Sequence, residues 1–157
     1  MTSPIGSYPA HLAETARMAN GTGFTLRPIL PQDAGPLRAF VHALSGPSRY
    51  FRFMTRINEM PEALAERFTR IDYTSHLALV ATRLESGREV MIGEARYVAD
   101  EHDRTTCELA IAVADAWHRS GIALTLLGRL ERPRRRRGGC RLLPEQQPPK
   151  PCLLSAD

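Results

Sequence analysis

Cysteine is scarce in this sequence, and its spacing fits neither a disulfide framework nor a zinc ribbon. The chain of 157 residues carries Cys107, Cys140 and Cys152, with no C-x-x-C pair. An odd count without paired spacing argues against both kinds of scaffold. The five histidines form no i, i+4 pair and have no cysteine neighbours, so no metal site is predicted. We therefore expect a protein of a reducing, cytoplasmic compartment.

Long apolar runs are also missing. No stretch approaches the ~18 apolar residues that span a bilayer. The first seven residues contain no basic region followed by an apolar stretch, which argues against a secretory signal. The chain is 43% hydrophobic and 24% charged, as in an ordinary folded domain, so the composition excludes wholesale disorder. The length fits one domain.

Lysine is nearly absent, because Lys150 is the only lysine among 21 basic residues. The net charge of +4 is unevenly distributed: residues 132–157 hold seven basic and two acidic residues, whereas residues 1–131 hold 14 and 15. The basic segment has no aromatic residue to stack on a base. Nucleic acid is therefore not expected as a partner, although phosphate contact by residues 134–137 is a weaker alternative.

Short apolar patterns separated by turn residues indicate an α/β protein with one sheet. Asn20-Gly21 lies between two such patterns and signals a β-hairpin. Asp33 is expected to cap one helix, and Pro61 to open a second. The predicted order is β-β-α-α-β-β-β-α, over residues 15–18, 23–27, 33–44, 61–68, 76–81, 89–98, 107–113 and 122–130.

The last 26 residues differ from the rest of the chain. They hold five of the twelve prolines and show neither strand nor helix periodicity. We predict that Pro133 ends the last helix and that residues 132–157 form a basic, proline-rich, disordered tail. Residues 1–23 are predicted to be a leader with the first hairpin strand, and residues 24–131 the folded domain.

The most informative segment is a strand that enters a helix through a turn of small residues. The strand covers residues 107–113, and Ser120, Gly121 and Ala123 surround the helix start. Such a turn directs free main-chain N–H groups and the positive end of the helix dipole at one place, which favours a diphosphate. Arg119 can add a charge-assisted contact. The alternative is an ordinary strand–helix connection in which small residues only ease packing.

The same segment resembles the acetyl-CoA-binding motif of the GNAT superfamily of N-acetyltransferases. That motif, Q/R-x-x-G-x-G/A, corresponds to residues 118–123 and usually follows a strand ending V-x-D-x-W, here Val113, Asp115 and Trp117. His118 departs from it, since Gln or Arg is usual there. A bacterial subgroup that includes protein-lysine acetyltransferases is similar over roughly residues 12–131, through the segments 26–29, 32–34, 48–53, 71–73 and 78–81.

The resemblance implies transfer of an acetyl group from acetyl-CoA to an amine, on a protein lysine or a small molecule. It also implies a GNAT-like three-layer fold of mixed α/β (α+β) class, with a central, mostly antiparallel sheet that is incomplete at the C-terminus. We interpret the chain as truncated or frameshifted after Glu131, which puts the activity of this form in question and leaves the strand at 107–113 as an exposed edge. The implied cofactor contacts are the main chain of Ala112 and Val113 for the pantetheine arm, and His118, Arg119, Ser120, Gly121, Ile122 and Ala123 for the diphosphate.

Glu108 is the candidate general base. Strand alternation places it on one face with Ala110 and Ala112, which indicates room for a ligand. In the lysine-acetylating subgroup a glutamate at the matching place acts as general base, and the resemblance implies this role for Glu108. An amine with an ordinary pKa of ~10.4 must lose a proton before it attacks. The alternative is a glutamate on a solvated strand face.

Other residues near the motif have plainer explanations. His76 is a second candidate base and Tyr73 a candidate acid, with structural roles as the favoured alternatives. Asp115 is expected to order the turn and Trp117 to anchor packing. The expected partners are acetyl-CoA and an amine acceptor, without a membrane, and a homodimer is left open. A non-catalytic acyl-CoA-binding regulatory module is the second functional hypothesis.

Overall fold

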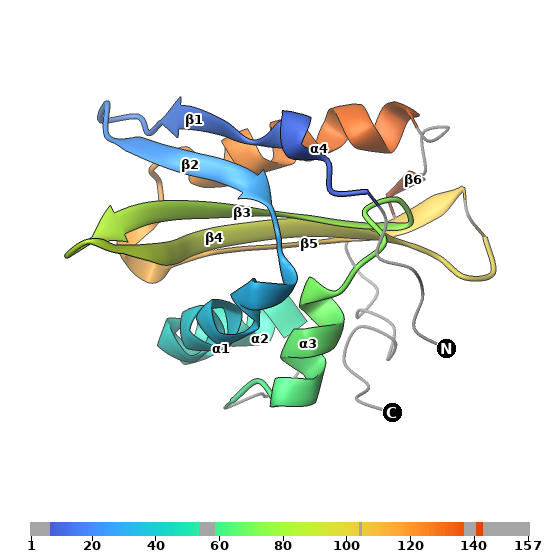
Figure 1. The fold of residues 1–157 in the computed structure, drawn as a ribbon, viewed down its shortest axis with the longest axis horizontal. Coiled ribbons are helices and arrows are strands. Elements are labelled where there is room, and N and C mark those ends of the chain that lie inside the picture. Colours follow the sequence, from blue (N-terminus) through green and yellow to red (C-terminus); the bar gives the residue numbers. More distant parts are fainter. Residues whose placement is uncertain (1–6, 54–58, 104, 137–140, 143–157) are drawn as a thin grey trace.

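The computed structural model, which describes residues 7–53, 59–103, 105–136 and 141–142, shows one sheet between two layers of helices (Figure 1). The strand order follows the sequence, β1-β2-β3-β4-β5-β6. Neighbouring strands are antiparallel, except that β5 and β6 are parallel. The strands are β1 (Glu14–Arg17), β2 (Gly23–Pro28), β3 (His76–Glu85), β4 (Arg88–Ala99), β5 (Thr106–Val113) and β6 (Arg141–Leu142).

Three helices cover one face of the sheet and one long helix covers the other (Figure 1). The first face carries α1 (Ala34–Ala43), α2 (Gly46–Phe53) and α3 (Glu62–Thr69), and the second carries α4 (Ile122–Arg136). A Cβ atom added to Gly93 of β4 would lie only 3.2 Å from Cγ2 of Ile122 and 3.3 Å from Cδ1 of Leu126. Gly93 therefore lets α4 pack directly against the sheet, which fixes where the preceding turn lies.

The predicted fold class is confirmed, as is the hairpin predicted at Asn20-Gly21. The β1–β2 turn closes through hydrogen bonds from the Met18 N–H to the Thr22 carbonyl and from the Gly21 N–H to the Met18 carbonyl. β3 and β4 form a second hairpin and pair along their lengths up to Glu85 and Arg88. The apolar positions that set these patterns form one core cluster between the sheet and its helices. Local patterns were sufficient here, because β2 alternates buried and exposed positions and β3 and β4 carry continuous buried runs.

Two helices differ from the prediction. Residues 46–53 form a helix, α2, that the sequence pattern did not indicate. The Ser45 side chain caps it by accepting a hydrogen bond from the Ser48 N–H at 3.2 Å. Pro133 does not end α4, which continues to Arg136. Proline removes one hydrogen bond of the helix, but Glu131 accepts hydrogen bonds from Arg134 and Arg135 across the same turn.

β6 lies within the segment that was predicted to be a disordered tail. Its two residues pair in parallel with Thr106 and Cys107 at the start of β5. The prediction of an exposed edge over residues 107–113 is therefore wrong for Cys107. Among the described residues, no strand pairs with residues 108–113 on that side. The rest of the predicted tail, residues 137–140 and 143–157, lies outside the described residues.

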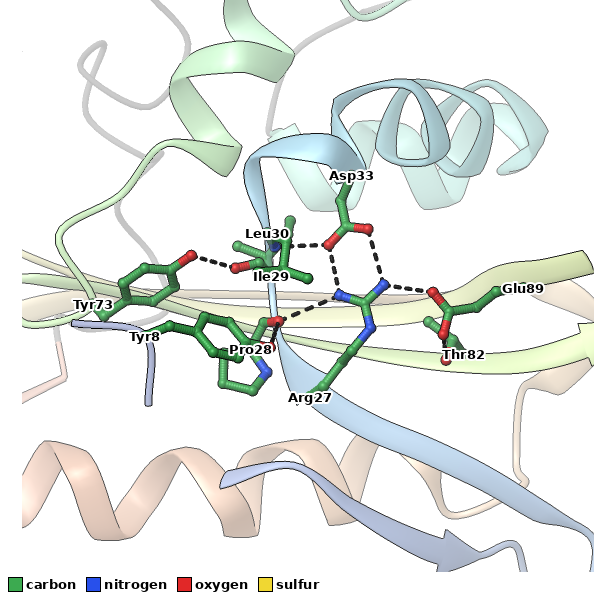
Figure 2. Close-up of polar contacts among 9 residues, drawn as sticks. All are labelled: Tyr8, Arg27, Pro28, Ile29, Leu30, Asp33, Tyr73, Thr82 and Glu89. Atoms are coloured by element: carbon green, nitrogen blue, oxygen red, sulfur yellow. Dashed lines mark hydrogen bonds and ion pairs between the residues drawn. The ribbon is translucent and has the colours of Figure 1, made fainter. Parts of the chain in front are cut away.

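Asp33 was expected to cap α1, but its carboxylate points back to Arg27 (Figure 2). The two side chains form a bidentate pair, with N–O distances of 2.7 and 2.9 Å, and Asp33 also accepts a hydrogen bond from the Leu30 N–H. The Arg27 side chain is only 14% exposed, and a buried charge without a counter-ion is destabilising. The Asp33 carboxylate therefore stabilises the fold more as the partner of Arg27 than it would as a cap of α1. Hydrogen bonding to Asp33 raises the pKa of Arg27 further above its usual range.

Candidate active site

The predicted turn is a tightly hydrogen-bonded connection between β5 and α4. After β5 a 3-10 turn over Asp115–Trp117 is closed by a hydrogen bond from the Trp117 N–H to the Ala114 carbonyl at 2.8 Å. Ser120 is held by its hydroxyl, which donates to the Trp117 carbonyl at 2.5 Å. Its carbonyl accepts a hydrogen bond from the Ala19 N–H of the first hairpin at 2.8 Å. The turn is therefore fixed from two sides before any ligand binds.

The turn leaves several main-chain donors unused. Of the residues that the structure describes, none accepts a hydrogen bond from the N–H of five positions, namely Arg119, Ser120, Gly121, Ala123 and Leu124. Arg119 and Gly121 have φ angles of 62° and 91°, in the left-handed region. Left-handed residues in a turn are typical of main-chain nests, in which successive N–H groups can bind an anion. The anion site at this turn stays a prediction.

A hollow of about 300 Å³ lies beside this turn. It is lined by Ile111, Ala112, Val113, Trp117, His118, Arg119 and Ala123. Five of the eight predicted cofactor residues line it, whereas Ser120 and Gly121 form the turn behind it. The Ile122 side chain is fully buried, and its N–H donates to the Ser120 hydroxyl at 3.4 Å, so Ile122 supports the turn from within.

Two lining residues were not among the predicted cofactor contacts. Ile111 could have been found from strand alternation, because it lies two residues before Val113 and shares its orientation. Trp117 was expected to be a packing anchor. It is one, since the Arg83 guanidinium lies 4.6 Å from its ring centroid, but its ring also forms part of the hollow.

The main chain of β5 offers a free edge next to the hollow. The Ala114 N–H donates to the Ile92 carbonyl, so the main-chain groups of Ala112, two residues earlier, also face β4. The main-chain groups of Ile111 and Val113 consequently face the opposite edge. Of the two residues predicted to pair with a pantetheine arm, only Val113 has the required main-chain orientation. Ala112 lines the hollow instead.

His118 already uses part of this edge. Its Nε2 lies 2.9 Å from the Val113 carbonyl, which can only accept, so Nε2 carries the proton. The His118 side chain is 51% exposed and can move aside. His118, which stands where Gln or Arg is usual, thus donates a hydrogen bond from its imidazole to the Val113 carbonyl beside the hollow.

Glu108 lies at the other end of the same strand segment. It pairs with Val98 of β4, which in turn pairs with His76 of β3. Together with Ala110 and Ala112 it points to the sheet face that α1, α2 and α3 cover. The residue is half-buried. β5 and β6 pair only just before Glu108, so the glutamate lies where the strand edge becomes free.

A buried charge cluster lies beside the two alanines of this face. Arg52 of α2 donates to Glu94 at 2.7 Å, and Arg96 donates to the other Glu94 oxygen at 2.6 Å. The three side chains are at most 1% exposed. The two guanidinium groups lower the pKa of Glu94 to about 2, although burial opposes this. Arg96 pairs across the sheet with Ala110, and Glu94 with Ala112.

His76 belongs to this cluster and is not a second base. Its Nε2 accepts a hydrogen bond from Arg96 at 3.0 Å, and its ring packs edge-on against Phe68. Burial and then the Arg96 charge lower the pKa of His76 to about 3, so it cannot take a proton at neutral pH. Tyr73 is not placed as an acid of the site either. Its hydroxyl donates a hydrogen bond to the carbonyl of Ile29, the residue that follows β2 (Figure 2).

The lowered pKa of His76 predicts loss of stability in mild acid. Unfolded His76 gains a proton as the pH falls through about 6.5, whereas the folded protein resists it down to about 3. The unfolded state therefore binds more protons, and the free energy of unfolding falls across this range. We expect the urea midpoint to drop between pH 7.5 and 5.0. His76→Gln should reduce that drop, and the same replacement at exposed His42 should not. An unchanged drop in His76→Gln would contradict the assignment.

Comparisons with known proteins agree with this geometry. A scan against protein-family models gives no match. The acetyltransferase PA5475 of Pseudomonas aeruginosa is 33% identical over 119 residues, which are 76% of this chain and 63% of the relative. The acetyltransferase Pat of Mycolicibacterium smegmatis is 32% identical over 119 residues, 73% of this chain and 33% of the relative. The chain thus spans less than two thirds of either relative.

Solved structures give the same picture. The fold is that of GNAT acetyltransferase domains, to which this chain is similar. The GNAT domain of S. lividans PAT superposes with a TM-score of 0.74 at 29% identity, covering 84% of this chain and 77% of that one. A GNAT-family acetyltransferase from Streptococcus pneumoniae shares the fold, with a TM-score of 0.59 at 20% identity, covering 76% of this chain and 72% of that one.

Within the described part of the chain, no group of three or more His, Cys, Asp or Glu side chains is arranged to hold a metal ion. None of the described helices is both long enough and apolar enough to cross a membrane.

Proposed function

We propose that this protein transfers the acetyl group of acetyl-CoA to an amine, on a protein lysine or a small molecule. The observation that carries the proposal is the continuity of three features. A turn with five unused N–H groups, a hollow of about 300 Å³ and the free edge of β5 follow one another and lead to Glu108. The named relatives support it, since both are acetyltransferases.

The residues present fit CoA. Its diphosphate would be held by the N–H groups of residues 119–121 and 123, at the positive end of α4, with the Arg119 guanidinium beside them. The pantetheine arm would extend along the main chain of Val113 and Ile111 like an added strand. The hollow alone is small for a ligand of this size, so most of the contact would lie along the edge.

The protein would contribute two effects to the chemistry. The bound co-substrate supplies an acetyl thioester. Glu108 would accept the proton that the attacking amine must lose. Main-chain N–H groups on the open edge between Val113 and Glu108 would stabilise the negative charge that develops on the thioester carbonyl oxygen. Neither effect needs a metal ion.

Trp117 offers a direct test, because it is the only tryptophan of the chain and lines the hollow. We expect acetyl-CoA to change its fluorescence in a saturable way. Gly121→Ala should weaken this binding about 5- to 100-fold, because a side chain at a φ of 91° strains the turn by about 1–3 kcal/mol. Fluorescence titration, with a thermal melt to verify folding, measures both effects.

Gly128→Ala is the matched control. Gly128 lies on α4, where an added Cβ meets nothing within 4 Å, so binding should be unchanged and the helix slightly more stable. Absence of a saturable signal in the wild-type protein would refute the proposal. Equal affinities in Gly121→Ala and the wild type would refute the role of the turn.

A further inference from the structure

Asp115 connects the cofactor turn to a helix that lies far from it in sequence. Its Oδ1 accepts a hydrogen bond from the Ser45 N–H at 3.4 Å and lies 4.0 Å from His118 Nε2. Hydrogen bonding to Ser45 lowers the pKa of Asp115, and His118 adds to the effect. Asp115 is thus an anion at ordinary pH, placed between His118 at the hollow and the start of α2.

Ser45 is the residue that begins α2. Its carbonyl accepts the first hydrogen bond of the helix, from the Arg49 N–H at 2.9 Å, and its hydroxyl caps the Ser48 N–H. A carboxylate beside a helix N-terminus is favoured by the helix dipole. Asp115 therefore holds the N-terminal end of α2 toward the turn that follows β5.

The other end of α2 is also anchored. Arg52, in its last turn, donates to Glu94 in the buried charge cluster. Glu94 lies beside Ala112, on the sheet face that also carries Glu108. Hence α2 is held at one end by the cofactor turn and at the other by the sheet, over the face that the amine would have to approach.

We infer that Asp115 is a positioning residue, which couples occupation of the cofactor turn to the placement of α2 over the Glu108 face. The inference rests on the proposed function. Acetyl-CoA bound at the turn restricts residues 115–118, and the Asp115–Ser45 contact transmits this restriction to the start of α2. The protein would then order its acceptor face only when the acetyl donor is present.

Hydrogen–deuterium exchange of the α2 peptide, residues 46–53, tests the coupling. In the wild-type protein, CoA should slow exchange of these amides. In Asp115→Asn, CoA should still change the Trp117 fluorescence with an affinity within about threefold of the wild type, because the exposed carboxylate does not contact the hollow directly. The CoA-dependent slowing of α2 should shrink about two- to fivefold, the size expected for an exposed charged contact.

The change in α2 amide exchange that CoA causes distinguishes coupling from a purely structural role of Asp115. If Asp115 only stabilised α2, the variant would exchange faster by the same factor with and without CoA, and the inference would be overturned. Glu85→Gln, an exposed carboxylate in the β3–β4 hairpin, is the control and should match the wild type. A wild-type protein without CoA-dependent fluorescence would instead refute the proposed function. Normal fluorescence with equal α2 protection in both proteins would refute the coupling alone.

Discussion

Replacing Glu108 with glutamine is expected to lower the rate of acetyl transfer about 10²- to 10⁴-fold, with acetyl-CoA affinity nearly unchanged. Glutamine keeps the shape of the side chain but cannot accept the proton of the amine. Glu108 lies where β5 leaves β6, at the opposite end of the β5 edge from residues 118–123. Its loss should therefore affect the chemical step and spare the cofactor contacts.

The measurement is release of free CoA thiol with a panel of lysine-containing peptides and small diamines, together with the Trp117 titration. Glu101→Gln is a suitable control, because Glu101 is an exposed carboxylate in the turn between β4 and β5, at the same end of the sheet. A Glu108→Gln variant with the turnover rate of the wild type would show that Glu108 is not the general base. Acetyl-CoA binding by the wild type without turnover of any acceptor would favour the non-catalytic binding module.

Replacing Glu94 with alanine is expected to reduce the free energy of unfolding by about 3–5 kcal/mol. The variant would leave the Arg52 and Arg96 guanidinium groups buried without the carboxylate that both contact. Buried charges that lose their counter-ion are destabilising because the low-dielectric interior cannot solvate them. This loss is a large fraction of the total stability of a typical domain, so soluble yield should fall as well.

Urea unfolding followed by circular dichroism measures this effect. Glu94→Gln, which keeps the shape and one acceptor, provides a second variant in case the alanine variant does not fold. Glu59→Ala is the exposed counterpart, since Glu59 pairs with Arg38 at the surface and should contribute at most about 1 kcal/mol. Similar losses for Glu94→Ala and Glu59→Ala would show that the cluster is not buried as described.

The sequence predicted the sheet and the turn because both depend on short-range rules. Continuous apolar runs mark the buried strands β3 and β4, and Asn20-Gly21 marks the first hairpin. The turn at residues 118–123 was recognisable because small residues must follow a strand where an anion is to approach the main chain. The structure adds that, within the described residues, the N–H groups of Arg119, Ser120, Gly121 and Ala123 have no acceptor.

Local rules failed where side-chain partners compete with them. Asp33 has the residue type of a helix cap, but the buried Arg27 guanidinium takes its carboxylate. Pro133 has the residue type of a helix stop, yet α4 continues past it. The sequence around His76 does not indicate its contact with Arg96. Burial and that contact lower the pKa of His76, so His76 cannot act as a base. Only the His76–Arg96 contact is distant in sequence, whereas the partners of Asp33 and the contacts across Pro133 lie within six residues.

Sequence alone thus determined the class of fold, the strand that borders the candidate site and the turn that offers its amides, because each is encoded in consecutive residues. Tertiary structure alone decided which main-chain groups of β5 face the open edge, that Glu94 lies buried between two arginines, and that Asp115 meets α2. These features arise from pairing register and from packing of segments distant in the chain. The free energy of each of these contacts depends on how deeply its side chains are buried. Burial depends on distant segments of the chain and is not encoded in neighbouring residues.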